Sequence, residues 1–212
     1  MTLIEPNDGL AIAPDWLARP SPEVAPDLVG CTLVRRFGNR LVRGLIVETE
    51  AYAPGDPACH AYRRRTPRNA VMFGPAGMTY VYLIYGIYHC LNVVTDQDGT
   101  PSAVLIRALH LPQIPDGLAL DKLKPTKKKP NPNRIAAGPG KLCQALEIDL
   151  SLTGRPLRPE QPLWLEHRST EVQRQIQQRQ IPLIQTTRIG LSQGTEIPWR
   201  WYIQGSPAVS KP

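Results

Sequence analysis

The sequence predicts an α+β fold, a single mixed domain in which short helices surround an antiparallel β-sheet. Its 212 residues fit one domain and are enough to bury a hydrophobic core. The 23 prolines and 16 glycines argue against long helices and favour short strands joined by ordered loops. Short apolar runs bounded by turn residues indicate several such strands and one protruding β-hairpin.

Two turn signals organise the strands. The pair Gly38-Asn39 separates two apolar runs, and Tyr85-Gly86 bends a hairpin in the middle of a tyrosine-rich run. The strands are predicted at residues 32–37, 41–51, 103–108 and 199–204, and the hairpin at residues 79–94.

The helices are expected to be short, and loops separate them. The polar, glutamine-rich residues 170–180 fit either a solvated helix or a linker, and the lysine- and proline-rich residues 123–133 are expected to form an exposed loop. We expect residues 1–14 to be a loose leader and residues 15–210 to form the domain. Helices are predicted at residues 15–19 and 21–29 and from residue 138, with Lys141 in the first turn of the last.

The formal charge of +7 favours a polyanionic partner such as nucleic acid, although many basic proteins have none. The opening residues MTLIEPNDGL lack a basic segment followed by an apolar run, so no secretory signal is expected. The most apolar window, residues 80–94, is interrupted by Gly86, His89 and Asn92 and is too short to cross a bilayer. We therefore expect a cytoplasmic protein with no membrane partner.

No metal or other cofactor is expected. The four cysteines form no CxxC pair, so they are expected to be free packing residues. His89 and Cys90 are adjacent on a strand and point to opposite faces, which disfavours a shared metal ion. The segment GPGKL, residues 138–142, lacks the longer pattern of a nucleotide phosphate loop, although it could hold one DNA phosphate.

Two carboxylates, Glu48 and Glu50, follow the apolar run Leu45–Val47 and share one face of the strand. A carboxylate in such a setting is partly desolvated and requires a partner or a function. Arg107, within the apolar strand AVLIRA, is placed to meet it. The pattern fits either a buried ion pair or a carboxylate that acts as a general base on an oriented water.

Four tyrosines gather in the hairpin. Tyr80 and Tyr88 are explained by the preference of aromatic residues for strands. Tyr85 lies at the expected tip, where a large ring would be exposed and could slide between base pairs.

Together these segments resemble the alkyladenine (methylpurine) DNA glycosylases, the 3-methyladenine DNA glycosylases of the non-helix-hairpin-helix type. The resemblance covers residues 17 to 210, and its pieces occur in the order of the family. They are GLIVETEAY, ACH, RTPRN, MTYVYLIYGIYHCLNVV, VLIRAL, GPGKLCQAL, TRIG and RWYIQGSP.

The resemblance implies a role for each matching residue. Glu50 would be the general base that activates water, and Arg107 and the main-chain carbonyl of Ile189 would hold that water. The resemblance further implies that Tyr52, Ala58, His60 and Tyr82 contact a flipped base, Asn92 disfavours guanine, Tyr85 fills the gap in the duplex, and Arg65, Arg68 and Lys141 contact the DNA backbone.

The resemblance also implies a curved sheet and a monofunctional enzyme. Such an enzyme would act as a monomer on double-stranded DNA with damaged purines and leave an abasic site. Two other interpretations stay open: a module that binds damaged DNA without cutting it, and a hydrolase of RNA or free nucleosides. An intact Glu50 with Arg107 argues against the first, and an intercalating tip with basic loops argues against the second.

Overall fold

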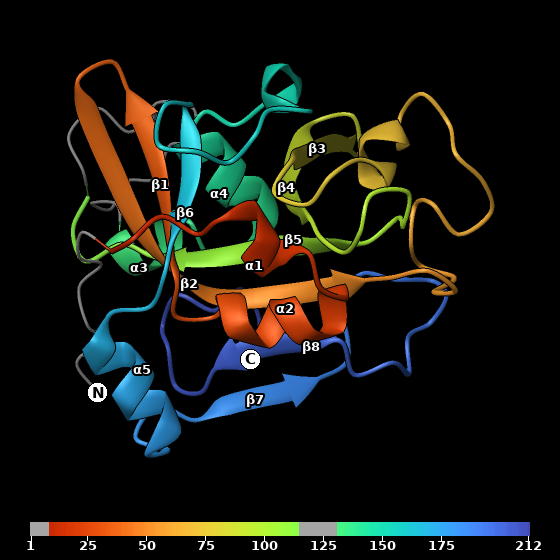
Figure 1. Ribbon diagram of the computed structural model, residues 1–212. Helices are drawn as coiled ribbons and strands as arrows, with labels where there is room; N and C mark the ends of the chain where they lie inside the picture. The colour runs from red at the N-terminus through yellow and green to blue at the C-terminus, as the bar shows by residue number, and fades with distance from the viewer. Residues whose placement is uncertain (1–8, 115–130) are drawn as a thin grey trace.

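In the computed structural model, which describes residues 9–114 and 131–212, eight strands form one curled antiparallel sheet among short helices (Figure 1). This confirms the predicted α+β class. The strand order is β3-β4-β5-β2-β1-β6, with β8 paired to β2 and β7 to β8. The strands are β1 Thr32–Phe37, β2 Arg40–Tyr52, β3 Thr79–Ile84, β4 Tyr88–Val94, β5 Ala103–His110, β6 Leu163–Glu166, β7 Leu183–Thr186 and β8 Arg200–Ile203.

Strand β2 is the centre of the sheet. Its first half pairs with β1, and its second half pairs with β5 on one edge and β8 on the other. Helix α2, Ser21–Leu28, packs on β2, where the Thr49 hydroxyl donates to the carbonyl of Ala25 over 2.8 Å (Figure 1). Residues 44–51 are buried without interruption, so every charge on this stretch needs a partner.

The pairing of β2 with β5 is irregular at the point where the charges lie. Ile46 pairs with Leu109 and Glu48 with Ala108, which leaves Val47 without a partner in the register. The next pair joins Thr49 to Ile106, which leaves Arg107 without a partner in the register in the same way. Bulges of this kind re-aim side chains, and here Arg107 reaches two carboxylates of β2.

The predicted hairpin is formed by β3 and β4, which meet at the pair Ile84–Tyr88. The three residues between them form the tip, where Tyr85 has φ +53° and Gly86 has φ +69°. Glycine adopts this left-handed backbone readily, whereas tyrosine seldom does. Tyr85 lies at this tip with 77 % of the residue exposed.

The helices are short, as expected, and residues 170–177 prove to be helical rather than a linker. The side chain of Ser169 caps this helix by accepting from the amide of Val172 over 3.1 Å. Besides α2, the helices are α1 Pro14–Leu17, α3 Pro132–Ile135, α4 Pro139–Ala145 and α5 Thr170–Gln177, with 3-10 turns η1 Ala70–Phe73 and η3 Leu150–Leu152.

Some expectations concern segments that are only partly described. Residues 1–8 of the predicted leader lie outside the described residues, and Ala11 and Ile12 run along β6, where the Ile12 amide donates to Leu165. The domain boundary at residue 15 therefore stays a prediction. The predicted exposed loop at residues 123–133 lies outside the described residues apart from its last three.

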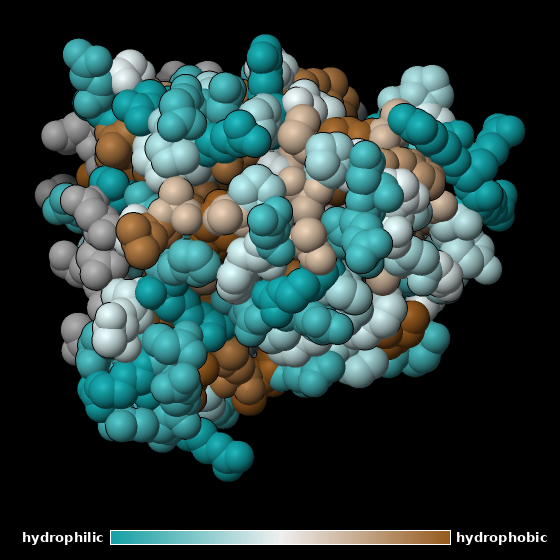
Figure 2. Space-filling model, in the orientation of Figure 1, coloured by the Kyte–Doolittle hydropathy of each residue, from teal (hydrophilic) through white to brown (hydrophobic). Residues whose placement is uncertain are grey.

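The core lies on both sides of β2 and β5, and all four cysteines are buried and free. Polar residues dominate the face drawn in Figure 2, where apolar residues form small scattered patches. No helix within the described ranges is both long enough and apolar enough to cross a membrane.

Candidate active site

The carboxylate of Glu50 is buried and held by three donors from three parts of the chain. Its Oε1 accepts from the amide of Ile189 at 2.8 Å and lies 3.1 Å from Nη1 of Arg107. Its Oε2 accepts from the hydroxyl of Tyr52 at 2.8 Å. Oε2 thus accepts one protein hydrogen bond and retains a lone pair for water.

Glu48 faces the same side of β2, and its carboxylate accepts four hydrogen bonds. Its Oε1 accepts from Nε of Arg107 at 2.9 Å, Nε of Arg200 at 2.8 Å and the hydroxyl of Ser210 at 2.9 Å. Its Oε2 accepts from the amide of Ser210 at 2.7 Å. Both interpretations of the acidic pair therefore apply in part, since Glu48 is a buried ion-pair partner and Glu50 is the carboxylate that can still take a water.

Arg107 joins the two acids. Burial lowers the pKa of the Arg107 guanidinium, but the charges of Glu50 and Glu48 outweigh burial and raise that pKa above its ordinary value. The guanidinium is therefore permanently charged, and it neutralises part of the negative charge that β2 buries.

A cavity of about 150 Å³ opens beside this cluster. It is smaller than the roughly 300–1,000 Å³ of sites for drug-sized ligands, which suits a single heterocycle. Tyr52 connects the cavity to the acid, because its ring lines the cavity while its hydroxyl donates to Glu50. The lining residues are Tyr52, Ala58, His60, Met72, Tyr80, Tyr82, Ile84, Asn92, Gly190 and Leu191.

The aromatic lining is uncharged near neutral pH. Burial, with a smaller contribution from the charge of Arg68, lowers the pKa of His60, whose Nδ1 lies 2.8 Å from the hydroxyl of Tyr80. Burial raises the pKa of Tyr80 to about 12 and the pKa of Tyr82 well above its ordinary value. The rings of His60 and Tyr82 meet edge to face with their centroids 4.5 Å apart.

A second buried ion pair fixes the loops around the cavity. Both terminal nitrogens of Arg188 donate to the carboxylate of Asp56, and Arg188 also donates to the carbonyl of Ala51 at 2.9 Å. The guanidinium lies 4.8 Å from the ring centre of Tyr52 and 5.5 Å from that of Trp199. The pair thereby ties the loop after β2 to the loop that carries Ile189.

A model of the methylpurine-DNA glycosylase family matches residues 15–207. The chain belongs to this family. It is a DNA glycosylase, a hydrolase of N-glycosyl bonds that acts on DNA in repair. The family assignment agrees with the resemblance drawn from the motifs.

Several relatives of this glycosylase carry the name "Putative 3-methyladenine DNA glycosylase". One from Trichodesmium erythraeum is 61 % identical over 197 residues, which cover 92 % of this chain and 95 % of the relative. One from Synechococcus sp. strain JA-3-3Ab is 54 % identical over 201 residues, covering 92 % and 97 %. One from Methanoculleus marisnigri is 46 % identical over 193 residues, covering 91 % and 95 %.

The glycosylase brings together most of the residues singled out from its sequence. The five predicted base contacts, Tyr52, Ala58, His60, Tyr82 and Asn92, line one cavity, and Glu50, Arg107 and Ile189 form one cluster beside it. The contact that Ile189 makes with Glu50 comes from its amide, whereas the motif directed attention to its carbonyl.

Sequence reasoning missed part of this site. Tyr80 was explained as a strand residue, yet it lines the cavity and contacts His60. Asp56 and Arg188 carried no signal of their own, although Arg188 stands inside the TRIG motif beside Ile189. The remaining lining residues, Met72, Ile84, Gly190 and Leu191, are apolar or small and could not be separated from ordinary core positions.

The predicted DNA-backbone residues of the glycosylase lie around the cavity rather than in it. The guanidinium of Arg68 lies 5.6 Å from the ring centre of Tyr82, and that of Arg65 lies 5.6 Å from the ring centre of Phe73. Lys141 is exposed on α4, next to Gly140, which packs against Tyr88 at the start of β4. These three charges are thus close to the two strands of the hairpin or the loop before it.

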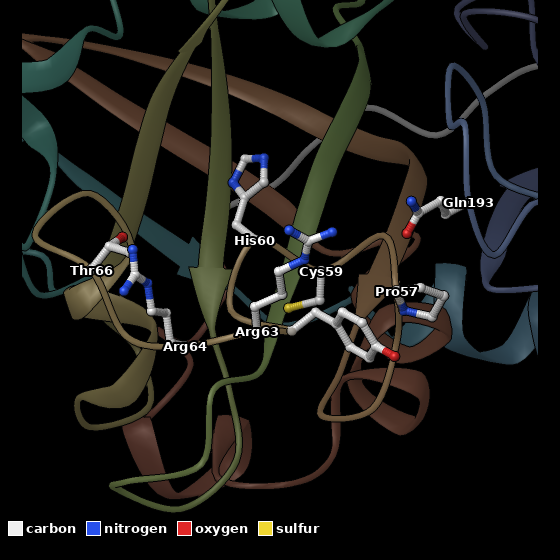
Figure 3. Close-up of a pocket in the computed structure, with 8 residues that line it drawn as sticks. Pro57, Cys59, His60, Arg63, Arg64, Thr66 and Gln193 are labelled. Atoms are coloured by element: carbon white, nitrogen blue, oxygen red, sulfur yellow. The ribbon is translucent and has the colours of Figure 1, made fainter.

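A second pocket of about 270 Å³ shares His60 with the base-sized cavity (Figure 3). Arg63, Arg64 and Thr66 reach it from the loop after β2, and Gln193 approaches from the loop after β7. Within residues 9–114 and 131–212, no carboxylate lines this pocket. Its charge is positive, which suits an anion.

Proposed function

We propose that this glycosylase flips alkylated or deaminated purines out of duplex DNA and hydrolyses the N-glycosidic bond with water activated by Glu50. The class of substrate comprises 3-methyladenine, 7-methylguanine, hypoxanthine and ethenoadenine, and the product is an abasic site. One observation carries the proposal: an oriented carboxylate with a spare lone pair lies behind an aromatic cavity of base size.

The cavity suits a flipped purine, and above all a positively charged one. Stacking between aromatic faces accepts any purine, and cation–π attraction favours an alkylated purine that carries a charge. Neutral His60 and protonated Tyr82 place no opposing charge against such a base. Selection then follows from the ease of extrusion and from the shape of the cavity.

Departure of the base leaves positive charge on the sugar, as in glycoside hydrolysis. The Glu50 carboxylate stabilises that charge and accepts a proton from the attacking water. The contacts of Glu50 come from Tyr52, Arg107 and Ile189, none of which is an amine nucleophile. We propose that water is the nucleophile and that the enzyme is monofunctional.

Base release from defined lesions tests this function. Duplexes with hypoxanthine or ethenoadenine at one position, and alkylated DNA for the two methylpurines, are incubated with excess enzyme. Released base is measured by chromatography, and abasic sites by alkaline cleavage. We expect release of at least one of the four bases with an uncut strand before alkali. Lesion-selective binding without release of any of them would identify a damage-binding module instead.

Tyr85 is proposed to fill the gap left by the flipped nucleotide. Tyr85→Asn removes the ring but keeps a residue that tolerates the left-handed backbone of the tip. We expect excision from fully paired duplex to slow by about tenfold or more, because inserted side chains offset an unstacking cost of a few kcal/mol. Single-turnover rates measure this, and a lesion in a mismatched or bulged site, which extrudes more easily, is expected to lose less.

Asn92 is proposed to reject guanine by a clash with its 2-amino group. The side chain is buried in the cavity wall, where its amide donates to the carbonyl of Tyr80 over 3.0 Å. Asn92→Ser opens space there, and we expect the ratio of lesion to guanine excision to fall by about tenfold. Release of guanine from unmodified plasmid measures the effect, and release that stays at background would contradict it.

The basic residues are proposed to hold the DNA backbone on either side of the flipped nucleotide. Three of them, Arg65, Arg68 and Lys141, lie near the hairpin or the loop before it. Two more, Arg63 and Arg64, line the second pocket, which contains His60. Because the pocket and the cavity share His60, a base in the cavity would bring a neighbouring phosphate towards these arginines. We expect the enzyme to act as a monomer.

A further inference from the structure

Glu48 accepts four hydrogen bonds next to the site, and the proposed mechanism does not use it. Its four donors come from β5, from β8 and from the segment after β8. All four lie far away in sequence: Arg107 is 59 residues on, Arg200 is 152, and Ser210 is 162. Oε1 of Glu48, with three donors, has no lone pair left for a reacting water. The contact with a cavity-lining side chain, Tyr52, belongs to Glu50, and so does the proposed role of base.

The geometry instead shows how Arg107 is divided between two acids. Its Nε points to Glu48 at 2.9 Å, while its Nη1 points to Glu50 at 3.1 Å. Its Nη2 donates to the hydroxyl of Ser210 at 3.3 Å. Each nitrogen of the guanidinium thus has its own partner. Arg107 therefore cannot form a bidentate pair with Glu50, in which two parallel hydrogen bonds join the guanidinium to the carboxylate.

We propose that Glu48, together with Arg200 and Ser210, is a positioning group that holds Arg107 so that it meets Glu50 through one nitrogen and leaves the carboxylate of Glu50 able to take a proton from water. This inference rests on the proposed role of Glu50 as general base. Glu48 touches neither the base nor the water in this scheme and acts only through Arg107.

The charges that face Glu50 indicate the direction of the effect. Glu50 is opposite Arg200 in the register of β2 with β8, and Glu48 lies two residues away on its own strand. The other groups that act on it are Arg107 from β5, Tyr52, Arg188, Tyr82 and Cys90. With Glu48 charged, two acids share Arg107, and Glu48 also pairs with Arg200. Without the charge of Glu48, Arg107 acts on Glu50 alone, and Arg200, opposite Glu50 in the register, loses its acid.

The test is Glu48→Gln, which keeps the shape of the side chain and removes its charge. The pH profile of single-turnover excision is measured on the alkylated purine that wild type releases fastest. That base already carries its charge, so it needs no protonation to leave. The acidic limb of the profile, where the rate rises with pH, therefore reports ionisation of a group on the enzyme. Glu50 must be ionised to act, and an uncompensated Arg107 favours its ionised form. We therefore expect the acidic limb to move down by about half a pH unit or more.

The maximal rate should fall as well, by up to about threefold, because a base weakened by about half a pH unit removes the proton of water less effectively. Arg200→Gln removes a cation from the same group and should move the acidic limb in the opposite direction, to higher pH. Ser210→Ala keeps every charge and should slow excision by about threefold without moving the limb, because one hydrogen bond to Glu48 and one from Arg107 are lost.

Glu166→Gln is the matched control. Glu166 is also a buried glutamate that contacts an arginine, Arg43, but it lies on β6 at the end of the sheet path. Its loss should affect stability without moving the acidic limb. An acidic limb that stays in place in both Glu48→Gln and Arg200→Gln would overturn the proposal, even if both variants are less stable.

Each failure can be told from the others. If Glu48→Gln does not fold, a shift of the acidic limb to higher pH in Arg200→Gln supports the proposal. An unchanged excision rate in Ser210→Ala contradicts it. If wild type excises lesions and the limb does not respond to these variants, the positioning role fails while the glycosylase activity stands. If wild type releases no base from any of the lesions, it is the proposed function that fails.

Discussion

Glu50→Gln is expected to abolish base release while leaving the binding of lesion duplex intact. The glutamine keeps the size of the side chain and can still accept from the amide of Ile189 and from Arg107. It cannot accept a proton from water or oppose the positive charge on the sugar. General-base catalysis alone contributes 10²–10⁴-fold, so we expect a loss of at least about 10³-fold. Single-turnover release from lesion duplex, beside a gel-shift measurement of affinity, separates the two effects.

The control for this variant is again Glu166→Gln, which removes a buried acid charge away from the cavity. It should retain the wild-type rate at a temperature where it is folded. A rate for Glu50→Gln within a few-fold of wild type would remove Glu50 from the mechanism. Loss of both release and lesion binding would instead point to a collapsed cavity.

Asp56→Ala is expected to produce the largest loss of stability. Asp56 and the side chain of Arg188 are buried, and the variant leaves a guanidinium charge without its carboxylate between the rings of Tyr52 and Trp199. Removing one partner of a buried pair costs about 3–5 kcal/mol. Urea unfolding should show a correspondingly lower midpoint, and excision at low temperature should fall because Ile189 follows Arg188 directly.

Two further variants show whether the unpaired charge causes this loss. In the double variant Asp56→Ala with Arg188→Met the charge is absent, and much of the stability should return, since apolar replacement of a whole buried pair is often close to neutral. Glu171→Ala breaks an exposed pair with Arg174 one turn away on α5 and should leave the midpoint unchanged. An equal shift in the single and double variants would show that lost packing, not charge, is responsible.

The parts of the fold that the sequence predicted well are those with strong local signals. Gly38-Asn39 marked the turn between β1 and β2, and Tyr85-Gly86 marked the tip of the β3–β4 hairpin. Strands β6 and β7 were missed because each has only four residues, too few for alternation to be seen, and neither has the tryptophan–tyrosine run that marked the equally short β8. Their pairing with β1 and β8 is decided by partners far away in the chain.

The residues of the site also divide into those with a strong signal in the sequence and those whose role depends on the folded structure. The acids Glu48 and Glu50 were visible because charges inside an apolar run are unusual, and Arg107 was visible for the same reason. The motif assigned the two acids different roles, but only the donors around each show why they differ. The bulges that bring Arg107 to both carboxylates have no signature in the residues themselves, because a skipped partner is a property of two strands together.

The way Glu48 is held has a consequence for how the enzyme is made. Its partners on β5, on β8 and at Ser210 are synthesised long after β2, at separations of 59 to 162 residues. Contacts so distant form late and slowly, because a long loop must close before any of them contributes. A growing chain on the ribosome that lacks residues 200–210 cannot complete the set of contacts around Glu48, which positions Arg107 beside Glu50 in the proposed scheme. We therefore expect the enzyme to leave DNA untouched until the domain has been synthesised to its final strand.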